Sequence, residues 1–439
     1  MATAYKIQLL PSDTGIFRFG GITPESAAKA SELLQKNHDE YHIFFNEIGL
    51  HNHLAHHVLS LFAVGSSPEL LQTQFDKNTS YQRQMKLPDN TIVAQMADAE
   101  LFKSFLADGN RYTEFLTFFA NEITQKGWQN VLEEYLFQGD ERADDLLARM
   151  FEGYLHPIIH LGLGIEFNQP AIIAEALAQA AVHDNNIGHF LLSSERAARL
   201  SNPPSTTLID LIDAVHKDPI LGDSARWNDR EKLVDGVLAR ASQELIKHGS
   251  MWKVKESELE RRTAEMINSN FVFTFGAQRP PKRIKLDFYY IHCTNASIFF
   301  SSFLQQEWLS TSTKIRLLEW KGRMDLAVYA SRGCPKILRD ELSTYAPKSE
   351  GGRAIDWDNV IKRAMDYVDC HAIKLIRAMA HAEAACRPYK SDSEFQIKGD
   401  GWLRLAGIAM DSVEEEEGVE DWIRNVGFDE AWDQFPDRV

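Results

Sequence analysis

The residues of this 439-residue chain that are best suited to chemistry are its fifteen histidines, most of which gather in four apolar stretches. Neutral imidazole binds iron, copper, nickel and zinc, and it exchanges protons near neutral pH. These histidines could therefore bind a metal ion or act in acid–base catalysis. The four stretches cover residues 51–63, 156–167, 288–300 and 367–381.

The first two stretches have histidines at helical spacing. His53 shares one helix face with His56 and His57, which follow it by three and four residues. His156 and His160 are also four residues apart. Leucine, isoleucine and valine flank both groups, and an unpaired buried polar group costs about 1–3 kcal/mol. These imidazoles therefore need partners, and a metal ion is one such partner.

The two later stretches hold fewer histidines. His292 lies among aromatic residues, and Asn295 follows it by about one helical turn. In the last stretch His371 and Lys374 lie about 60° apart on a helix, and His381 shares the same broad stripe. A lysine in so apolar a helix is costly to bury with its charge. We therefore expect Lys374 to lose its proton or to gain a partner.

Any one of these histidines is more simply explained as a hydrogen-bonded core residue, and H-x-x-x-H without an intervening glutamate is not the metalloprotease motif. Four such groups in one chain make a metal site a serious alternative. Structural zinc is disfavoured, because it usually takes cysteine ligands and the cysteines here are not grouped. They are Cys293, Cys334, Cys370 and Cys386.

Helical periodicity dominates the elements that must position these residues. Alternating apolar residues predict one short strand at 270–275. Pro157 predicts that a helix ends at His156 or restarts there as a short turn. We expect an all-α fold, a large array of helices that encloses a central buried site. The expected helices cover residues 24–48, 52–64, 96–107, 111–125, 128–137, 143–155, 170–182, 206–217, 229–247, 256–268, 286–307, 311–328 and 355–386.

Residues 1–439 are expected to form a single, mainly helical catalytic domain, with loops or sub-boundaries near 201–205 and 278–281. A chain of this length can bury a large core without a metal ion to stabilise the fold, so a metal site should be functional.

The net charge of −16 argues against nucleic-acid binding. No apolar run approaches 18 residues and the N-terminus lacks a signal-peptide pattern, so we expect no membrane span. The absence of C-x-x-C pairs fits a reducing compartment, and we expect a cytoplasmic protein.

The chain lacks G-x-G-x-x-G, G-x-x-x-x-G-K-[ST] and G-x-S-x-G motifs, so a Rossmann-type NAD or FAD domain and a serine-hydrolase elbow are not expected.

Two histidine-rich runs of this chain, at 51–57 and 156–167, resemble hallmarks of the questin oxidase-like family, as do the residues that follow them at 63–65 and 174–178. His292-Cys293-Thr294 and the helix from His371 to His381 agree with this resemblance, which covers about residues 24–410. It implies an oxygenase that cleaves a carbon–carbon bond of an anthraquinone-type aromatic polyketide in secondary metabolism.

The resemblance also implies a non-haem iron(II), with dioxygen as co-substrate, held by four histidines and a lysine carboxylated on its amine. Lys374 is then the carboxylated lysine, and its oxygen replaces the carboxylate of the 2-His-1-carboxylate triad. His53 and His156 are expected to support the ligands or to face the substrate. The implied histidine ligands are His160, His292, His371 and one of the adjacent pair His56 and His57, between which the sequence does not decide.

Thr294, Asn295 and Tyr367 are expected to hydrogen-bond substrate oxygens, although each has an equally good structural explanation.

Family members are linked to NADPH, but the chain has no dinucleotide fingerprint. We therefore expect reducing equivalents from a pre-reduced substrate or a separate reductase, with NADPH acting indirectly. Two alternatives stay open at this point. One is a metal-independent Baeyer–Villiger-type oxidase with histidine acid and base groups, and the other is a non-catalytic helical binding protein.

Overall fold

The computed structural model describes residues 1–347, 355–414 and 418–438. Over these residues it contains 21 α-helices and no strand, only isolated β-bridges. The all-α prediction is confirmed. None of the helices in the described ranges combines the length and the apolar character that a membrane span requires.

Two compact units make up the chain. Unit 1 comprises Met1–Gly188 and Met365–Lys374, and unit 2 comprises His189–Ala364 and Leu375–Val439. Unit 1 therefore joins the first two histidine stretches to part of the last one. That the whole chain acts as one catalytic domain stays a prediction.

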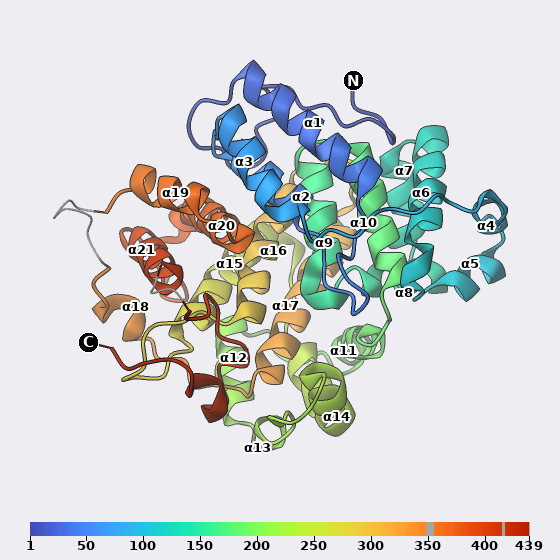
Figure 1. The fold of residues 1–439 in the computed structure, drawn as a ribbon. Coiled ribbons are helices and arrows are strands. Elements are labelled where there is room, and N and C mark those ends of the chain that lie inside the picture. Colours follow the sequence, from blue (N-terminus) through green and yellow to red (C-terminus); the bar gives the residue numbers. More distant parts are fainter. Residues whose placement is uncertain (348–354, 415–417, 439) are drawn as a thin grey trace. The chain divides into compact units, whose positions relative to one another are not determined.

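Unit 1 is built around α9 and α10, which pack along each other, with α6 on α10 (Figure 1). Gly164 of α9 allows a close approach, because a Cβ atom there would lie 2.9 Å from the backbone nitrogen of Ile173. α2 packs against α1, α3 and α9. The helices are α1 Pro24–Glu40, α2 Leu54–Ala63, α3 Pro68–Thr79, α4 Asn90–Gln95, α5 Ala99–Phe105, α6 Tyr112–Lys126, α7 Trp128–Leu132, α8 Glu141–Arg149, α9 Glu152–Glu166 and α10 Pro170–Val182.

In unit 2, α16 packs against α15 and α17, and α12 lies against α15 and α17. A fully buried ion pair, Lys321–Asp325 on α17, binds Asn270 of α15. The helices of this part of the chain are α11 Gly188–Ser201, α12 Leu208–Lys217, α13 Pro219–Gly222, α14 Ala239–Ser250, α15 Leu259–Gly276, α16 Phe288–Leu304, α17 Thr311–Ser331, α18 Glu341–Thr344, α19 Trp357–Asp366, α20 Cys370–Cys386 and α21 Gly401–Val413.

Two predicted elements are wrong in type or number, and the helix predicted at 24–48 ends at Glu40. Residues 270–275 are the last turns of α15 and not a strand. This segment is buried on every side, so its apolar alternation did not mark a half-buried strand. The predicted helix at 355–386 is two helices, α19 and α20, separated at 367–369. Asp369 accepts a hydrogen bond from the backbone N–H of His371, at 2.7 Å, and so caps the start of α20.

The helix break expected before Pro157 is present. Gly153, Tyr154 and Leu155 at the start of α9 have φ values of 53°, 55° and 72°, which is left-handed backbone. For a residue other than glycine this conformation costs about 1–2 kcal/mol. Right-handed helix resumes only at His156.

Candidate metal centre

Lys374 is the last residue of unit 1 and lies on α20, one helical turn after His371. Its side chain is buried, with 7% of its surface exposed. The charge of its amine contributes, after burial, to lowering the pKa of His53, His57 and His156, and it acts in the same direction on His56. Burial and the amine also act to lower the pKa of His371, but the charges of Cys370 and Asp369 outweigh them and raise it.

Burial keeps most of these imidazoles neutral. It lowers the pKa of His57 to about 3, with Lys374 as the second cause. Burial likewise holds the pKa of His53 and that of His156 well below the usual value, again with Lys374 as the next cause. Neutral imidazole is the form that binds metal ions, so the centre is set up for coordination at neutral pH.

Three of these rings converge within unit 1. The Nε2 atoms of His53 and His156 lie 2.7 Å apart. The ring of His53 meets that of His371 edge-on, with centroids 4.7 Å apart. One ligand atom each from His53, Cys370 and His371 lie within 4.8 Å of one another. Two nitrogen ligands at about 2.1 Å from one cation and at right angles are about 3 Å apart, so this spacing suits a shared ion.

The other ring nitrogen of each of two histidines is held by an oxygen acceptor. His156 Nδ1 lies 2.6 Å from the carbonyl oxygen of Gly153, and His371 Nδ1 lies 2.6 Å from Asp369 Oδ1. Each Nδ1 therefore carries the proton, and the lone pair is on Nε2. This is the arrangement that orients histidine ligands in metal sites.

In unit 2, the ring of His292 on α16 has the same arrangement. Its Nδ1 lies 2.6 Å from the carbonyl oxygen of Phe288, and the side chain is 1% exposed. Its lone pair is again on Nε2. The local geometry of His292 is that of a histidine ligand, and its membership of the metal centre stays a prediction.

A second chain of hydrogen bonds runs beside these rings. Glu175 of α10 accepts from His38 Nδ1 and from His160 Nε2, both at 2.6 Å. His160 Nδ1 in turn accepts from His56 Nε2 at 3.1 Å. Both ring nitrogens of His160 are therefore engaged. His56 Nδ1 and His57 Nε2 are buried and have no hydrogen-bond partner among the described residues.

The carboxyl of Glu175 is ionised despite its burial. Burial raises its pKa, but the hydrogen bonds from His160 and His38 outweigh this and lower it to about 2. A folded-state pKa below the usual 4.5 means that the carboxylate stabilises the fold fully above about pH 4.5, and that this stability is lost as the pH falls towards 2.

We expect Glu175→Gln to lower the free energy of unfolding at pH 7 by about 3 kcal/mol, because it leaves a buried network without its charge. The difference from wild type should shrink below pH 4.5, as measured by urea denaturation at several pH values. Glu32→Gln, which removes an exposed partner of Lys29, should cost less than about 1 kcal/mol. A Glu175→Gln deficit that does not change between pH 7 and pH 3 would contradict this account.

The three residues predicted to contact substrate differ in their surroundings. Thr294 donates to the carbonyl oxygen of Ile291 at 2.8 Å, which accounts for its hydroxyl structurally. Asn295 is 3% exposed, and neither its amide nitrogen nor its amide oxygen has a hydrogen-bond partner among the described residues. Tyr367 is half-buried in the break between α19 and α20. Asn295 is therefore the one whose burial calls for a ligand.

Glu175, Gly153 and Gln179 were missed by the reasoning from sequence. Glu175 and Gln179 interrupt an alanine-rich helix at a spacing of four, which could have marked a buried polar face. Gln179 is 1% exposed, and its amide has no hydrogen-bond partner among the described residues. No feature of the sequence distinguishes Gly153 from an ordinary turn glycine.

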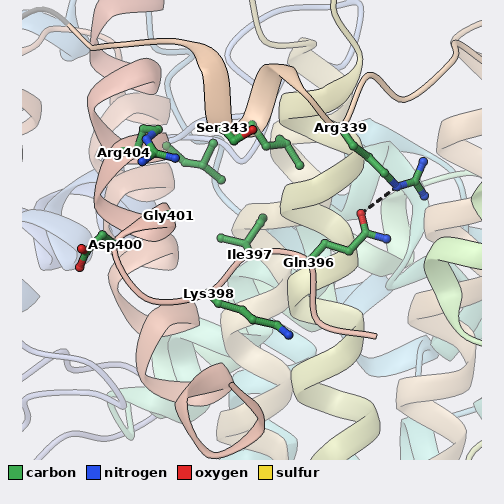
Figure 2. A pocket seen from close by; sticks show the side chains of 10 residues that line it. Arg339, Ser343, Gln396, Ile397, Lys398, Asp400, Gly401 and Arg404 are labelled. Atoms are coloured by element: carbon green, nitrogen blue, oxygen red, sulfur yellow. Dashed lines mark hydrogen bonds between the residues drawn. The ribbon is translucent and has the colours of Figure 1, made fainter. Parts of the chain in front are cut away.

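A surface pocket of about 560 Å³ lies in unit 2 and is lined by none of the predicted site residues (Figure 2). Arg339 on its wall binds Asp213 at 2.7 Å and Gln396 at 2.9 Å, so its guanidinium is already engaged. The pocket contains none of the histidines and not the lysine that were predicted to bind the metal. It is lined by Arg339, Leu342, Ser343, Gln396, Ile397, Lys398, Asp400, Gly401, Arg404 and Leu405.

Comparison with known proteins identifies the family of this chain. Residues 50–379 match the family described as questin oxidase-like. The chain is 38% identical to questin oxidase of Aspergillus terreus, over 98% of each chain. It is 38% identical to Baeyer–Villiger oxidase ptaJ of Pestalotiopsis fici, over 99% of each, and 37% identical to oxidoreductase AflY of Aspergillus parasiticus, over 99% of this chain and 94% of that one. The chain is an oxidoreductase that belongs to the questin oxidase-like family.

Proposed function

We propose that this enzyme is a non-haem iron oxygenase that cleaves a carbon–carbon bond of a reduced anthraquinone-type polyketide in secondary metabolism. The names of the relatives support the substrate class and the oxidative chemistry. The observation that carries the iron proposal is the convergence of the rings of His53, His156 and His371 in unit 1, with the buried Lys374 following His371 by about one helical turn.

The residues present fit a hard-to-borderline cation such as iron(II). Nitrogen lone pairs fixed by hydrogen bonds at the opposite ring atom are its usual ligands, and a carboxylated lysine supplies an anionic oxygen. We assign His371 and Lys374 to this ion, and His292 stays a predicted ligand. For the remaining positions the resemblance favoured His160 with His56 or His57. The geometry favours His53 and His156 as ligands, because both ring nitrogens of His160 are already hydrogen-bonded, one to Glu175 and the other to His56.

Bound iron(II) would supply the one-electron chemistry by which dioxygen, the co-substrate, reacts with an organic molecule. The chain's own residues provide a dry site and a fixed orientation. Asp369 holds the ring of His371, and the buried amide of Asn295 is suited to a ring carbonyl oxygen of the substrate. His57 Nε2 is a neutral base without a partner among the described residues, suited to accept a proton from a substrate hydroxyl.

The electrons are proposed to enter with the substrate in its reduced, hydroquinone form. A separate reductase would use NADPH to make that form, since the chain has no dinucleotide fingerprint. The partners are then a small aromatic molecule and a reductase.

The unpartnered nitrogens of His56 and His57 also favour a second candidate, a metal-independent oxidase in which these bases deprotonate the reduced substrate. It shares the substrate and the product with the first proposal. The two candidates differ in whether removal of iron stops the reaction.

The test is to feed purified protein with chemically reduced questin under oxygen, with iron loaded and with iron removed by a chelator. We expect oxygen uptake and ring cleavage only with iron. Equal rates after iron removal would favour the metal-independent oxidase. Strict dependence on added NADPH, with no other protein present, would refute entry of electrons through the substrate.

A further inference from the structure

The left-handed turn of residues 153–155 is held in place by specific contacts. The N–H of Ile158 donates to the carbonyl oxygen of Met150 across the turn, at 2.9 Å. Leu155 is fully buried. The buried carboxyl of Glu152 accepts from the backbone N–H groups of Asn186 and Ile187, at 2.5 and 2.9 Å. A turn in unfavourable backbone conformation is thus fixed from both sides.

The turn delivers one carbonyl group to one imidazole. In a regular helix the carbonyl of Gly153 would accept from the N–H of residue 157, but Pro157 has no N–H. His156 Nδ1 takes its place, at 2.6 Å from that oxygen. Because Pro157 has no N–H and the left-handed backbone breaks the helix here, the carbonyl oxygen of Gly153 is available to accept the hydrogen bond of the imidazole.

The face of the His156 ring is fixed by a second pair of histidines. His51 stacks on it with ring centroids 3.8 Å apart and planes 6° from parallel. His51 Nε2 lies 2.8 Å from His183 Nε2. Gly153 packs against both: a Cβ atom at this position would lie 2.6 Å from His183 Cε1 and 2.8 Å from His51 Cε1. Only glycine fits here, for steric as well as backbone reasons.

We propose that Gly153, His51 and His183 are positioning residues that hold the proton of His156 on Nδ1 and fix its ring plane, so that Nε2 carries the lone pair for a ligand. They act through His156. The proposal deepens the proposed function and rests on it for the identity of that ligand. The tautomer and the ring orientation are properties of the metal-free protein, so they are tested separately.

The first experiment reads the tautomer directly. In metal-free protein with ¹⁵N-labelled histidine, the His156 signals are assigned by comparison with His156→Gln. We expect the proton on Nδ1 in wild type, and a mixture of tautomers in Gly153→Ala. Gly139→Ala is the matched control, because Gly139 also has left-handed backbone, with φ 81°, but has nothing within 4 Å of an added Cβ atom. It should leave the His156 signals unchanged.

The second experiment measures the affinity of the same proteins for Co²⁺, as a spectroscopic substitute for iron. Removal of such orienting partners typically weakens metal binding 10–100-fold. We expect this loss in Gly153→Ala and none in Gly139→Ala. If Gly153→Ala does not fold, His183→Ala replaces it and should show the same changes to a smaller extent.

The outcomes separate the two proposals. A proton on Nε2 of His156 in wild type, or equal effects of Gly153→Ala and Gly139→Ala, would overturn the positioning role. A wild-type protein with the expected tautomer that binds no Co²⁺ or iron would leave the positioning role standing and would overturn the proposed function.

Discussion

Lys374→Ala should abolish iron retention and oxygenase activity. Lys374 is the residue proposed to be carboxylated, so its loss removes the one anionic oxygen that the proposed centre has. We expect the iron content, measured by elemental analysis, to fall more than tenfold, with the fold intact because a buried amine has been removed. Wild-type iron content should also fall when protein is purified without bicarbonate, which lysine carboxylation requires.

Acetate or propionate should restore part of the iron binding to Lys374→Ala, because a short carboxylate fits the space that the side chain leaves. The matched control is Lys77→Ala. Lys77 is an exposed lysine whose charge also acts on His57, though more weakly than that of Lys374. The Lys77→Ala variant should retain the same iron content as wild type. Full retention by Lys374→Ala itself would show that this lysine is not a ligand.

His156→Gln and His160→Gln should have opposite effects. His156→Gln should weaken iron binding at least 100-fold with little change in stability, because it removes a ligand. His160→Gln should keep iron within about tenfold, and should lower the free energy of unfolding by about 1–3 kcal/mol, because the buried Glu175 carboxylate loses one of its hydrogen-bond donors. Metal titration and urea denaturation of the two variants measure both quantities.

If His160→Gln lost its iron and His156→Gln kept it, the ligand set implied by the resemblance would be the right one. His160 would then bind the iron and His156 would not. Equal loss of iron in both variants would place both histidines on the ion. Either result would contradict the assignment made from the hydrogen bonds of Glu175.

Much of the architecture could be predicted from sequence because it follows from local rules. The Thr23-Pro24 start of α1, the apolar periodicity of α10 and the break at Pro157 depend on nearest neighbours along the chain. The strand at 270–275 was wrong because complete burial hides the period that separates a strand from a helix. The break between α19 and α20 was missed because capping by Asp369 outweighs an apolar pattern that runs through it.

The candidate site could be predicted only in part. The spacing of the histidines predicted stretches whose rings lie close together within unit 1, and the role of Lys374 as a ligand stays a prediction. Which nitrogen of each ring carries a proton depends on residues distant in the chain, such as Glu175 for His160, or on the backbone of Gly153 for His156. Side-chain hydrogen bonds of this kind leave no periodic trace in a sequence.

The central claim is that buried imidazoles and Lys374 hold one iron ion. X-ray absorption of protein loaded anaerobically with iron(II) in the presence of bicarbonate tests it most directly. We predict one iron per chain, with imidazole nitrogens and at least one oxygen as ligands and no sulfur. Iron that does not bind above background, or a shell with sulfur that would assign Cys370, would contradict this account.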